Sequence, residues 1–381
     1  MSFKWSLPLG SLAGIPVFLH WTFVFILAYV SIYVAFIGGG LIDIIYHIIF
    51  VLALFACVVL HELGHALAAR NYNITTRDIV LLPIGGMARL EKMPEDPVQE
   101  LVVAVAGPLV NVVIALILAP LVIIMGVPEF EGEGPVFLRP DNFLFALTAV
   151  NIFLVLFNMI PAFPMDGGRV FRAILGFWYG HAEATRKAAT VGQSFAILFF
   201  IAAFFVNPLL ILIAFFVFFG SHAESSYIQT KYALSGYKIR DVMMSNFTLL
   251  RKDDQVYRAV ELLLKGSEQE FVVIDEEGKM TGVLTRNDII QGLSEVGRRA
   301  SLEHLIHKDI TSFSPETPIE NAYHHMSQTG LSISPVINRD GEVIGVVDRD
   351  NIFEFIWIQD ALEAREKVKA RLEEESGKPA S

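Results

Sequence analysis

Long, almost uncharged stretches alternate with short polar connections over the first 226 residues of the chain. A helix needs about 20 apolar residues to cross the hydrocarbon core of a bilayer. Five stretches approach or exceed this length, and a shorter sixth block follows an Asn-Pro pair that is typical of a turn. The predicted spans are residues 17–37, 44–69, 101–125, 142–165, 188–206 and 209–220. The pattern therefore predicts a polytopic α-helical membrane domain with about six transmembrane helices.

The composition agrees with a membrane domain and divides the chain in two. Of its 381 residues, 54% are hydrophobic, and the mean hydropathy of +0.52 is well above that of a soluble domain. Only 10 of the 29 Lys/Arg residues and 14 of the 40 Asp/Glu residues lie in residues 1–226. We therefore expect a membrane domain at 1–226, a linker at 227–238 and a soluble remainder. The net charge of −11 gives no reason to expect nucleic-acid binding.

Basic residues gather in alternate connections between the spans. They precede the first span and follow the second, fourth and sixth, whereas the opposite connections hold only Arg139 among acidic residues. The basic residues are Lys4, Arg70, Arg77, Arg89, Lys92, Arg169, Arg172, Arg186, Lys187, Lys231, Lys238 and Arg240. Because cytoplasmic connections carry the excess of Lys and Arg, a multi-pass protein of the cell membrane with both termini cytoplasmic is predicted. Residues 17–37 are too long for a signal-peptide core, so we expect them to be retained.

The span at 44–69 contains a motif that is unusual in lipid. His61, Glu62 and His65 read HELGH, and on a helix both imidazoles share one face, so they can bind one metal ion with Glu62 beside it. Ionisable residues are costly in a membrane and are by default functional-site candidates. If this span runs inward, His61 lies about 26 Å along it, near the cytoplasmic edge of a core roughly 30 Å thick. We predict a membrane-embedded metal site close to the cytoplasm.

A third ligand is predicted just after the span at 142–165. The segment from Pro161 to Gly168 contains two prolines, which end a helix, and a glycine pair, which permits a tight turn. Asp166 is thereby left at the depth of the two histidines. Two histidines and one carboxylate, with a fourth position open, are typical of a catalytic zinc site. A Zn²⁺ ion acidifies water, and Glu62 is predicted to accept its proton and later to protonate the departing amine.

These motifs resemble those of the site-2 proteases, which are intramembrane zinc metalloproteases. The resemblance rests on HELGH, on the element from Asn158 to Gly168, and on the GPLVN sequence from Gly107 to Asn111. It covers roughly residues 10–225. It implies that the substrate is a transmembrane segment of another protein and that Asn158 helps to bind the scissile carbonyl. The alternative for Asn158 is an ordinary hydrogen bond within a buried helix pair.

The nine apolar residues at 79–87 are too few to span a bilayer. They predict a re-entrant loop or a short strand, covered by protein or by a water-filled cavity. An exposed strand edge at Gly85 and Gly86 would be able to accept an extended substrate peptide by strand addition, the alternative being a loop that merely packs on the bundle. Cys57 shares a helix face with His61, but its coordination would close the site, so we interpret it as a buried apolar filler.

The soluble part contains an internal repeat. Residues 272–289 align with residues 335–352 at a fixed offset of 63, and each copy reads strand, glycine-bearing turn, strand and helix start. The repeat resembles a tandem pair of CBS domains, with copies at 239–298 and 299–357. Two α/β units that pair pseudo-symmetrically are therefore expected. A charged tail at 358–381 is predicted to be a solvated helix and a possible dimer contact.

The CBS resemblance implies a ligand, because this family often binds adenine nucleotides such as ATP, ADP or AMP between its copies. The first copy carries the matching Thr285 and Asp288, whereas the second has Asp348 and Asn351 at the equivalent positions. An extra carboxylate repels phosphate, although an asparagine can still bind a hydroxyl group, so one nucleotide site is favoured over two. The alternative for Asp288 is a helix cap.

Together, these features predict a zinc-dependent endopeptidase that cleaves transmembrane segments of membrane proteins near the cytoplasmic face. Adenine nucleotides are expected to modulate it, and a homodimer is expected through the CBS pair. One alternative is a transporter or channel gated by the CBS pair, in which the intramembrane His and Glu residues line an ion pathway. Another is a metal-binding scaffold whose partner performs the chemistry.

Overall fold

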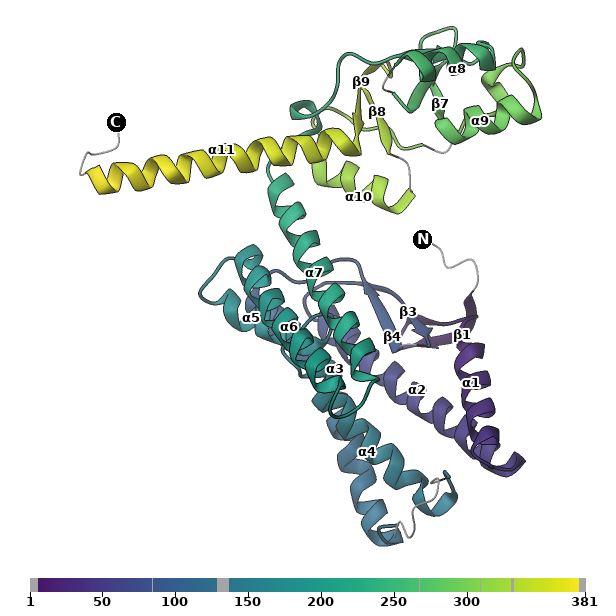
Figure 1. Ribbon diagram of the computed structural model, residues 1–381, viewed down its shortest axis with the longest axis vertical. Coiled ribbons are helices and arrows are strands. Elements are labelled where there is room, and N and C mark those ends of the chain that lie inside the picture. The colour runs from purple at the N-terminus through teal and green to yellow at the C-terminus, as the bar shows by residue number, and fades with distance from the viewer. Residues whose placement is uncertain are drawn as a thin grey trace. The chain divides into compact units, whose positions relative to one another are not determined.

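The computed structural model describes residues 6–83, 85–128, 137–266, 268–308, 310–329 and 332–376. Lys4 and the acidic connection at 129–136, on which the predicted topology partly rests, lie outside these residues. The chain forms two compact units, Ser2–Gln229 and Thr230–Ser381. Figure 1 shows the first as helices around a small sheet and the second as two similar α/β halves.

A four-stranded sheet lies in the N-terminal unit. Its strands are β1 (Ser6–Leu12), β2 (Ile15–His20), β3 (Thr76–Leu82) and β4 (Gly85–Leu90), in the order β1-β2-β3-β4. β1 and β2 pair antiparallel, β2 and β3 parallel, and β3 and β4 antiparallel. The segment at 79–87 is therefore part of a strand hairpin, and β4 is an edge strand. The short-strand prediction for this segment is confirmed.

Seven helices are described in this unit. They are α1 (Phe23–Phe36), α2 (Leu41–Arg70), α3 (Pro97–Met125), α4 (Pro140–Asn158), α5 (Asp166–Gly176), α6 (His181–Ala203) and α7 (Leu210–Leu234). The start of α3 illustrates how the sequence sets their bounds. Asp96 accepts a 2.9 Å hydrogen bond from the backbone N–H of Gln99, and Pro97 occupies the first helical position, where its missing N–H costs nothing.

All six predicted spans contain helix, but four of the described helices are long and apolar enough to cross a membrane: α2, α3, α4 and α7. The prediction of one helix over 17–37 is wrong. Residues 17–20 belong to β2, where Val17 is buried against β3, so their apolar character serves the sheet rather than lipid. The remaining α1 has 14 residues, about 21 Å of helix.

The last two spans also differ from their predicted bounds. α6 begins at His181, and its first turns are polar, with Arg186 and Lys187 among them. α7 has 25 residues and continues to Leu234, so most of the predicted linker at 227–238 is helical. A short apolar block after Asn207 is thus the first half of a longer helix.

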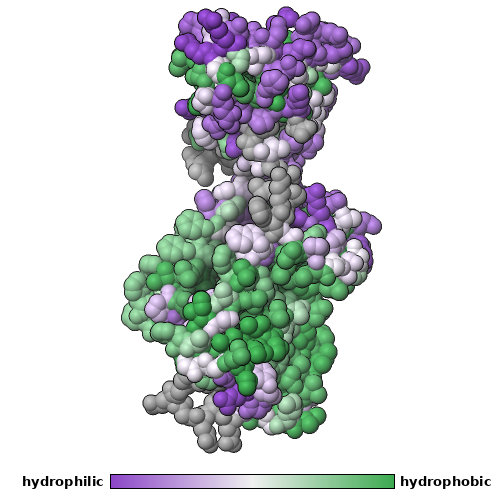
Figure 2. All heavy atoms as spheres, turned by 90° about the vertical axis from the view of Figure 1, so that its right-hand side faces the viewer, coloured by the Kyte–Doolittle hydropathy of each residue, from purple (hydrophilic) through white to green (hydrophobic). Residues whose placement is uncertain are grey.

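Apolar side chains cover much of the outside of the N-terminal unit. Phe36, Ile124 and Phe205 are 87%, 80% and 84% exposed. Figure 2 shows hydrophobic residues (green) over this unit and hydrophilic residues (purple) over the C-terminal unit. Soluble proteins rarely expose such extended apolar surface. The N-terminal unit is an α-helical membrane domain, and the C-terminal unit is a soluble α/β fold.

The C-terminal unit repeats itself at the predicted offset of 63. The elements of the first copy are η1 (Ile239–Asp241), β5 (Leu249–Arg251), α8 (Val256–Lys265), β6 (Glu270–Ile274), β7 (Met280–Thr285) and α9 (Arg286–Glu295). Those of the second are η2 (Leu302–His304), α10 (Ile319–Thr329), β8 (Ile333–Ile337), β9 (Val343–Asp348) and α11 (Arg349–Ser376). Five pairs of equivalent elements, η1/η2, α8/α10, β6/β8, β7/β9 and α9/α11, begin 63 residues apart.

The two copies exchange strand partners, as the predicted pseudo-symmetry requires. Met244, which lies between η1 and β5 of the first copy, forms two backbone hydrogen bonds with Val346 in β9. The equivalent His307 forms the same two bonds with Val283 in β7. Leu234, the last residue of α7, is fully buried in the core that α10, β8, β9 and α11 help to form. The two halves therefore share one fold rather than standing as separate domains.

Candidate metal centre

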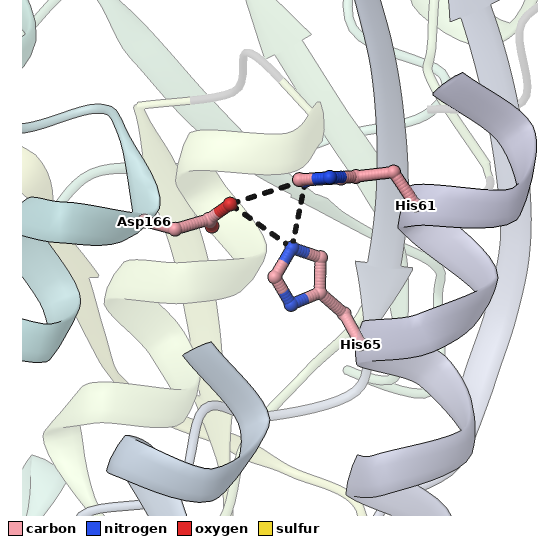
Figure 3. A group of neighbouring side chains, drawn as sticks. All are labelled: His61, His65 and Asp166. Carbon is pink, nitrogen blue, oxygen red and sulfur yellow. Dashed lines mark hydrogen bonds and ion pairs between the residues drawn. The ribbon is translucent and has the colours of Figure 1, made fainter. Parts of the chain in front are cut away.

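Three ionisable side chains converge in the interior of the membrane domain. His61 and His65 project from one face of α2, one turn apart, and Asp166 projects from the first residue of α5 (Figure 3). The Oδ2 atom of Asp166 lies 3.1 Å from His61 Nε2 and 3.2 Å from His65 Nε2, and the two Nε2 atoms are 3.1 Å apart. All three residues are at least 94% buried. The three residues predicted as metal ligands are thus brought together.

The hydrogen bonds on the far side of each imidazole determine which nitrogen atoms face the centre. His61 Nδ1 donates to Oδ1 of Asn111 at 2.5 Å, and His65 Nδ1 donates to the carbonyl of Val103 at 2.7 Å. In neutral imidazoles, each Nε2 atom then carries a lone pair. The two lone pairs point at each other and at the Asp166 carboxylate. Converging lone pairs repel one another unless a cation lies among them. The donor set fits Zn²⁺, which binds histidine nitrogen and carboxylate oxygen.

A chain of buried amides fixes the acceptor for His61. Asn111 Nδ2 donates to Asn151 Oδ1 at 2.8 Å, and Asn151 Nδ2 donates to the carbonyl of Leu147 at 2.8 Å. Both asparagines are fully buried. Because the amide nitrogen of Asn111 donates to Asn151, its Oδ1 atom is the acceptor for the imidazole of His61. Sequence reasoning missed Asn151, although a polar residue inside an apolar span was a usable signal.

Two glycines allow α2 and α3 to approach closely beside the histidines. A β-carbon at Gly107 would overlap Nε2 of His65 and would lie 2.8 Å from Nε2 of His61. A β-carbon at Gly64 would lie 2.7 Å from the carbonyl oxygen of Ala106. Any larger residue at Gly107 would therefore occupy the space in which a metal ion must lie.

The segment before Asp166 is as tight as the prolines and glycines predicted. α4 ends at Asn158, and α5 begins at Asp166. A β-carbon at Gly167 would overlap the backbone of residues 159–160, and one at Gly168 would lie 2.6 Å from the carbonyl carbon of Ala162. The turn therefore needs both glycines for close packing. It places Asp166 beside His61 and His65.

Glu62 lies beside the three-residue group and contacts the edge of the sheet. Its Oε2 atom accepts a 2.9 Å hydrogen bond from the backbone N–H of Ala88 in β4. A β-carbon at Gly86 would lie 2.8 Å from Cγ of Glu62, so this glycine lets the strand approach the carboxylate. Gly85 adopts a positive φ of 139°, a conformation that favours glycine. The predicted substrate-binding glycines thus lie next to the predicted base.

Asn158 and Cys57 lie outside the three-residue group. Asn158 is the last residue of α4, partly exposed, and its side chain makes no hydrogen bond to another of the described residues. Its proposed contact with substrate stays a prediction. Cys57 is buried, and its sulfur accepts a 3.5 Å hydrogen bond from Asn151 Nδ2. The thiol therefore packs behind the amide chain.

In the C-terminal unit, Thr285 and Asp288 bind mainly each other. The Thr285 hydroxyl and backbone N–H donate to Asp288 Oδ2 at 2.5 and 2.8 Å, and the backbone N–H of Asp288 donates to the Thr285 hydroxyl at 3.3 Å. Nε2 of His307 lies 3.0 Å from the second Asp288 oxygen. This is a capping box at the start of α9, the arrangement of the helix-cap alternative.

A cleft of about 170 Å³ lies between the two copies, lined by residues of both. Its charged lining consists of Glu268 and Glu270 from the first copy and Asp348, Arg349 and Asp350 from the second. Burial raises the pKa of Glu270 and of Asp348 above their ordinary values. Asp348 caps α11 through a 2.7 Å bond from the backbone N–H of Asn351, whose side chain does not line the cleft. Sequence reasoning favoured the first copy because it could not see which side chains were already paired.

Family comparisons agree with the site. The model for peptidase family M50 matches residues 49–132 and 135–203, and the CBS-domain model matches residues 239–295 and 302–358. The zinc metalloprotease MJ0392 of Methanocaldococcus jannaschii is 31% identical over 370 residues, which cover 96% of this chain and 99% of that protein. The chain belongs to peptidase family M50 and carries a pair of CBS domains after its protease domain.

Two further matches cover parts of the chain. Stage IV sporulation protein FB of Bacillus subtilis is 24% identical over 270 residues, covering 68% of this chain and 89% of that protein. The solved structure of a site-2 protease from Methanocaldococcus jannaschii is 37% identical, with a TM-score of 0.42, and covers 58% of this chain and 95% of that chain. The family assignment identifies a zinc metalloprotease, so neither the transporter nor the scaffold alternative is retained.

Proposed function

We propose that this protease cleaves transmembrane segments of other membrane proteins near the cytoplasmic face of the cell membrane. The observation that carries the proposal is the burial of His61, His65 and Asp166 beside one another on helices of a domain with an apolar exterior. These three side chains would hold Zn²⁺. When bound, the ion polarises the scissile carbonyl and lowers the pKa of a water molecule.

Glu62 is proposed as the general base and later the general acid. Its Oε2 atom is held by the N–H of Ala88, which fixes the carboxylate beside the three ligands and leaves Oε1 to receive a proton. The same oxygen would return that proton to the departing amine. Asn158 is proposed to donate a hydrogen bond to the scissile carbonyl from the end of α4, where its amide has no other described partner.

The edge of β4 is proposed to bind the substrate in extended form. Alternate residues of a strand direct their backbone groups to the same side, so Gly86 faces outward with Ala88. A peptide added along this edge would pass the carboxylate of Glu62, and Gly85, where a β-carbon would meet nothing within 4 Å, leaves the peptide backbone room to approach. Helical substrate segments must unwind to bind in this way, because their carbonyls are already hydrogen-bonded.

A multi-pass topology with both termini in the cytoplasm is proposed from the distribution of basic residues. In this orientation α2 runs inward. His61 follows Leu41, the first residue of α2, by about 30 Å of helix, which supports a site near the cytoplasmic boundary. The proposed division of the chain remains a membrane protease domain at 1–226, CBS domains at 239–298 and 299–357, and a tail at 358–381.

The CBS pair is proposed to bind an adenine nucleotide that modulates the protease, and to mediate a homodimer. Thr285, Asp288, Asp348 and Asn351 are the candidate contacts. The cleft that Asp348 lines supports binding between the two copies, although its carboxylates lower the affinity for phosphate. Calorimetry of the full-length protein with AMP, ADP and ATP tests this proposal, and absence of binding at millimolar concentration would refute it.

The protease proposal is tested by comparing membrane proteins in cells with and without the active enzyme. We expect substrates to be cut within an apolar segment, close to its cytoplasmic end. A purified substrate should then be cleaved by the zinc-loaded protein and spared after chelation of the metal. Cleavage confined to extracellular loops would contradict the proposed location of the site.

A further inference from the structure

α7 touches the segment that carries Asp166 at two places. At the first, Ser221 is fully buried and its hydroxyl donates a 3.0 Å hydrogen bond to the carbonyl of Phe163. Beside it, a β-carbon at Gly220 would lie 2.6 Å from Cδ of Pro164. The helix therefore packs directly on the turn three residues before Asp166.

The second contact is an ionic triad around a buried arginine. Arg172, on α5 with Asp166, is 1% exposed. Its Nε atom donates to Glu100 of α3 at 2.7 Å, and its Nη1 atom donates to Glu224 of α7 at 2.6 Å. Its guanidinium group also lies 5.0 Å from the centre of the Phe163 ring. One arginine thus joins α3, α5, α7 and the turn before Asp166.

Buried ion pairs add little net stability, because desolvation offsets much of their attraction. What the triad provides is a defined geometry, since a planar guanidinium binds two carboxylates in a fixed directional arrangement. Arg172 fixes the rotation of α5 about its own axis, and the Ser221–Phe163 bond fixes the turn that leads into this helix. One constraint therefore acts on the 11-residue helix that Asp166 begins, and the other acts on the three residues before it.

We propose that Ser221, Glu224 and Arg172 are positioning residues for Asp166, so that α7 sets the place of the third metal ligand. The inference rests on the proposed role of Asp166 in holding zinc. Ser221, Glu224 and Arg172 themselves lie outside HELGH and outside the element from Asn158 to Gly168. Nothing in the linear pattern pairs Ser221 with Phe163, 58 positions away, or Arg172 with Glu224, 52 positions away, which explains why the sequence did not reveal these contacts.

The test uses the full-length protein and the variants Glu224→Gln and Ser221→Ala. Zinc affinity is measured by competition with a chelator, and the ligand geometry is read from the visible absorption spectrum of the Co²⁺-loaded protein. Partners that orient metal ligands typically contribute a factor of about 10 to 100 in metal affinity. We expect both variants to lose zinc affinity within this range and to show an altered Co²⁺ spectrum.

Glu183→Gln is the matched control, because it removes a carboxylate from an exposed pair with Arg186 on α6. It should leave zinc affinity and the spectrum unchanged. If Glu224→Gln does not fold, Ser221→Ala, which removes a single hydrogen bond, carries the test. Wild-type affinity and spectrum in a folded variant would overturn the positioning role.

The results that would refute the proposed function differ from those that would refute this inference. If the wild-type protein binds no zinc, or if Asp166→Ala binds it with unchanged affinity, the assigned metal site is wrong. If wild type binds zinc through Asp166 but neither α7 variant alters its affinity or spectrum, only the positioning inference is wrong.

Discussion

Asn111 in α3 accepts a 2.5 Å hydrogen bond from Nδ1 of His61 in α2. This bond selects the tautomer whose Nε2 lone pair points to the candidate metal position, and it fixes the plane of the ring. Asn111 can act in this way because Asn151 occupies its amide donor at 2.8 Å. A residue outside the HELGH motif therefore orients the imidazole of His61, one of the motif's candidate metal ligands.

Replacing Asn111 with Ala is expected to weaken zinc binding by a factor of about 10 to 100, since the imidazole loses its orienting acceptor. Asn111→Asp keeps an acceptor oxygen and should retain more affinity than Ala. Chelator competition measures both. Asn321→Ala, at an exposed asparagine of α10, is the control and should behave as wild type. Equal affinity of Asn111→Ala and wild type would show that the amide has no role in orienting His61.

Gly107→Ala is expected to abolish zinc binding while the protein still folds in the membrane. The added methyl group would overlap Nε2 of His65 and approach that of His61 to 2.8 Å, so it would fill the metal position. Zinc content after purification, measured by elemental analysis, should fall to less than a tenth of the wild-type value.

Gly180→Ala provides the control for that experiment. A β-carbon at Gly180 would meet nothing within 4 Å, so this variant should keep its zinc. A full complement of zinc in Gly107→Ala would mean that α2 and α3 separate more easily than their packing indicates.

The acidic cleft predicts a pH dependence of AMP binding. Burial raises the pKa of Asp348 and Glu270, so both carboxyl groups take up protons at a higher pH than ordinary carboxyls do. Their repulsion of phosphate is therefore present at neutral pH and fades as the pH falls. Asp348→Asn should bind AMP about three- to tenfold more tightly than wild type at pH 7.5.

The difference between wild type and Asp348→Asn should shrink as the pH falls to 5.5, because burial raises the pKa of Asp348 and its carboxyl therefore takes up protons at a higher pH than an ordinary carboxyl does. Comparing the two proteins cancels the titration of the phosphate itself. Calorimetry at several pH values measures the effect. A difference that is constant over this range would contradict the assignment of AMP to this cleft.

Much of the metal centre could be predicted because its constraints are local. Helical periodicity alone places His61 and His65 on one face. The prolines before Asp166 end one helix, and the glycines after it allow the tight turn into the next, so the sequence predicts where this carboxylate lies along the chain. The repeat of the C-terminal unit was equally visible, since an offset of 63 is preserved from α8 to α11.

Other features depended on tertiary contacts that the linear pattern does not contain. Residues 17–20 are apolar because they face a sheet, and a hydropathy pattern cannot distinguish burial in protein from burial in lipid. The roles of Asn151 and Ser221 depend on which helix lies opposite. The motif at Thr285 matched a nucleotide site, yet its side chains bind one another, and the cleft between the copies is lined by neither Thr285 nor Asp288.

The central claim is that Glu62 transfers the proton in peptide-bond hydrolysis at a site formed by His61, His65 and Asp166. The most direct test is to measure zinc content and cleavage of a purified membrane substrate by wild type and by Glu62→Gln. We expect equal zinc content and a fall in cleavage of about a thousandfold, within the range of general acid–base contributions of about 10²–10⁴. Glu62→Gln that keeps its zinc and cleaves at the wild-type rate would contradict it.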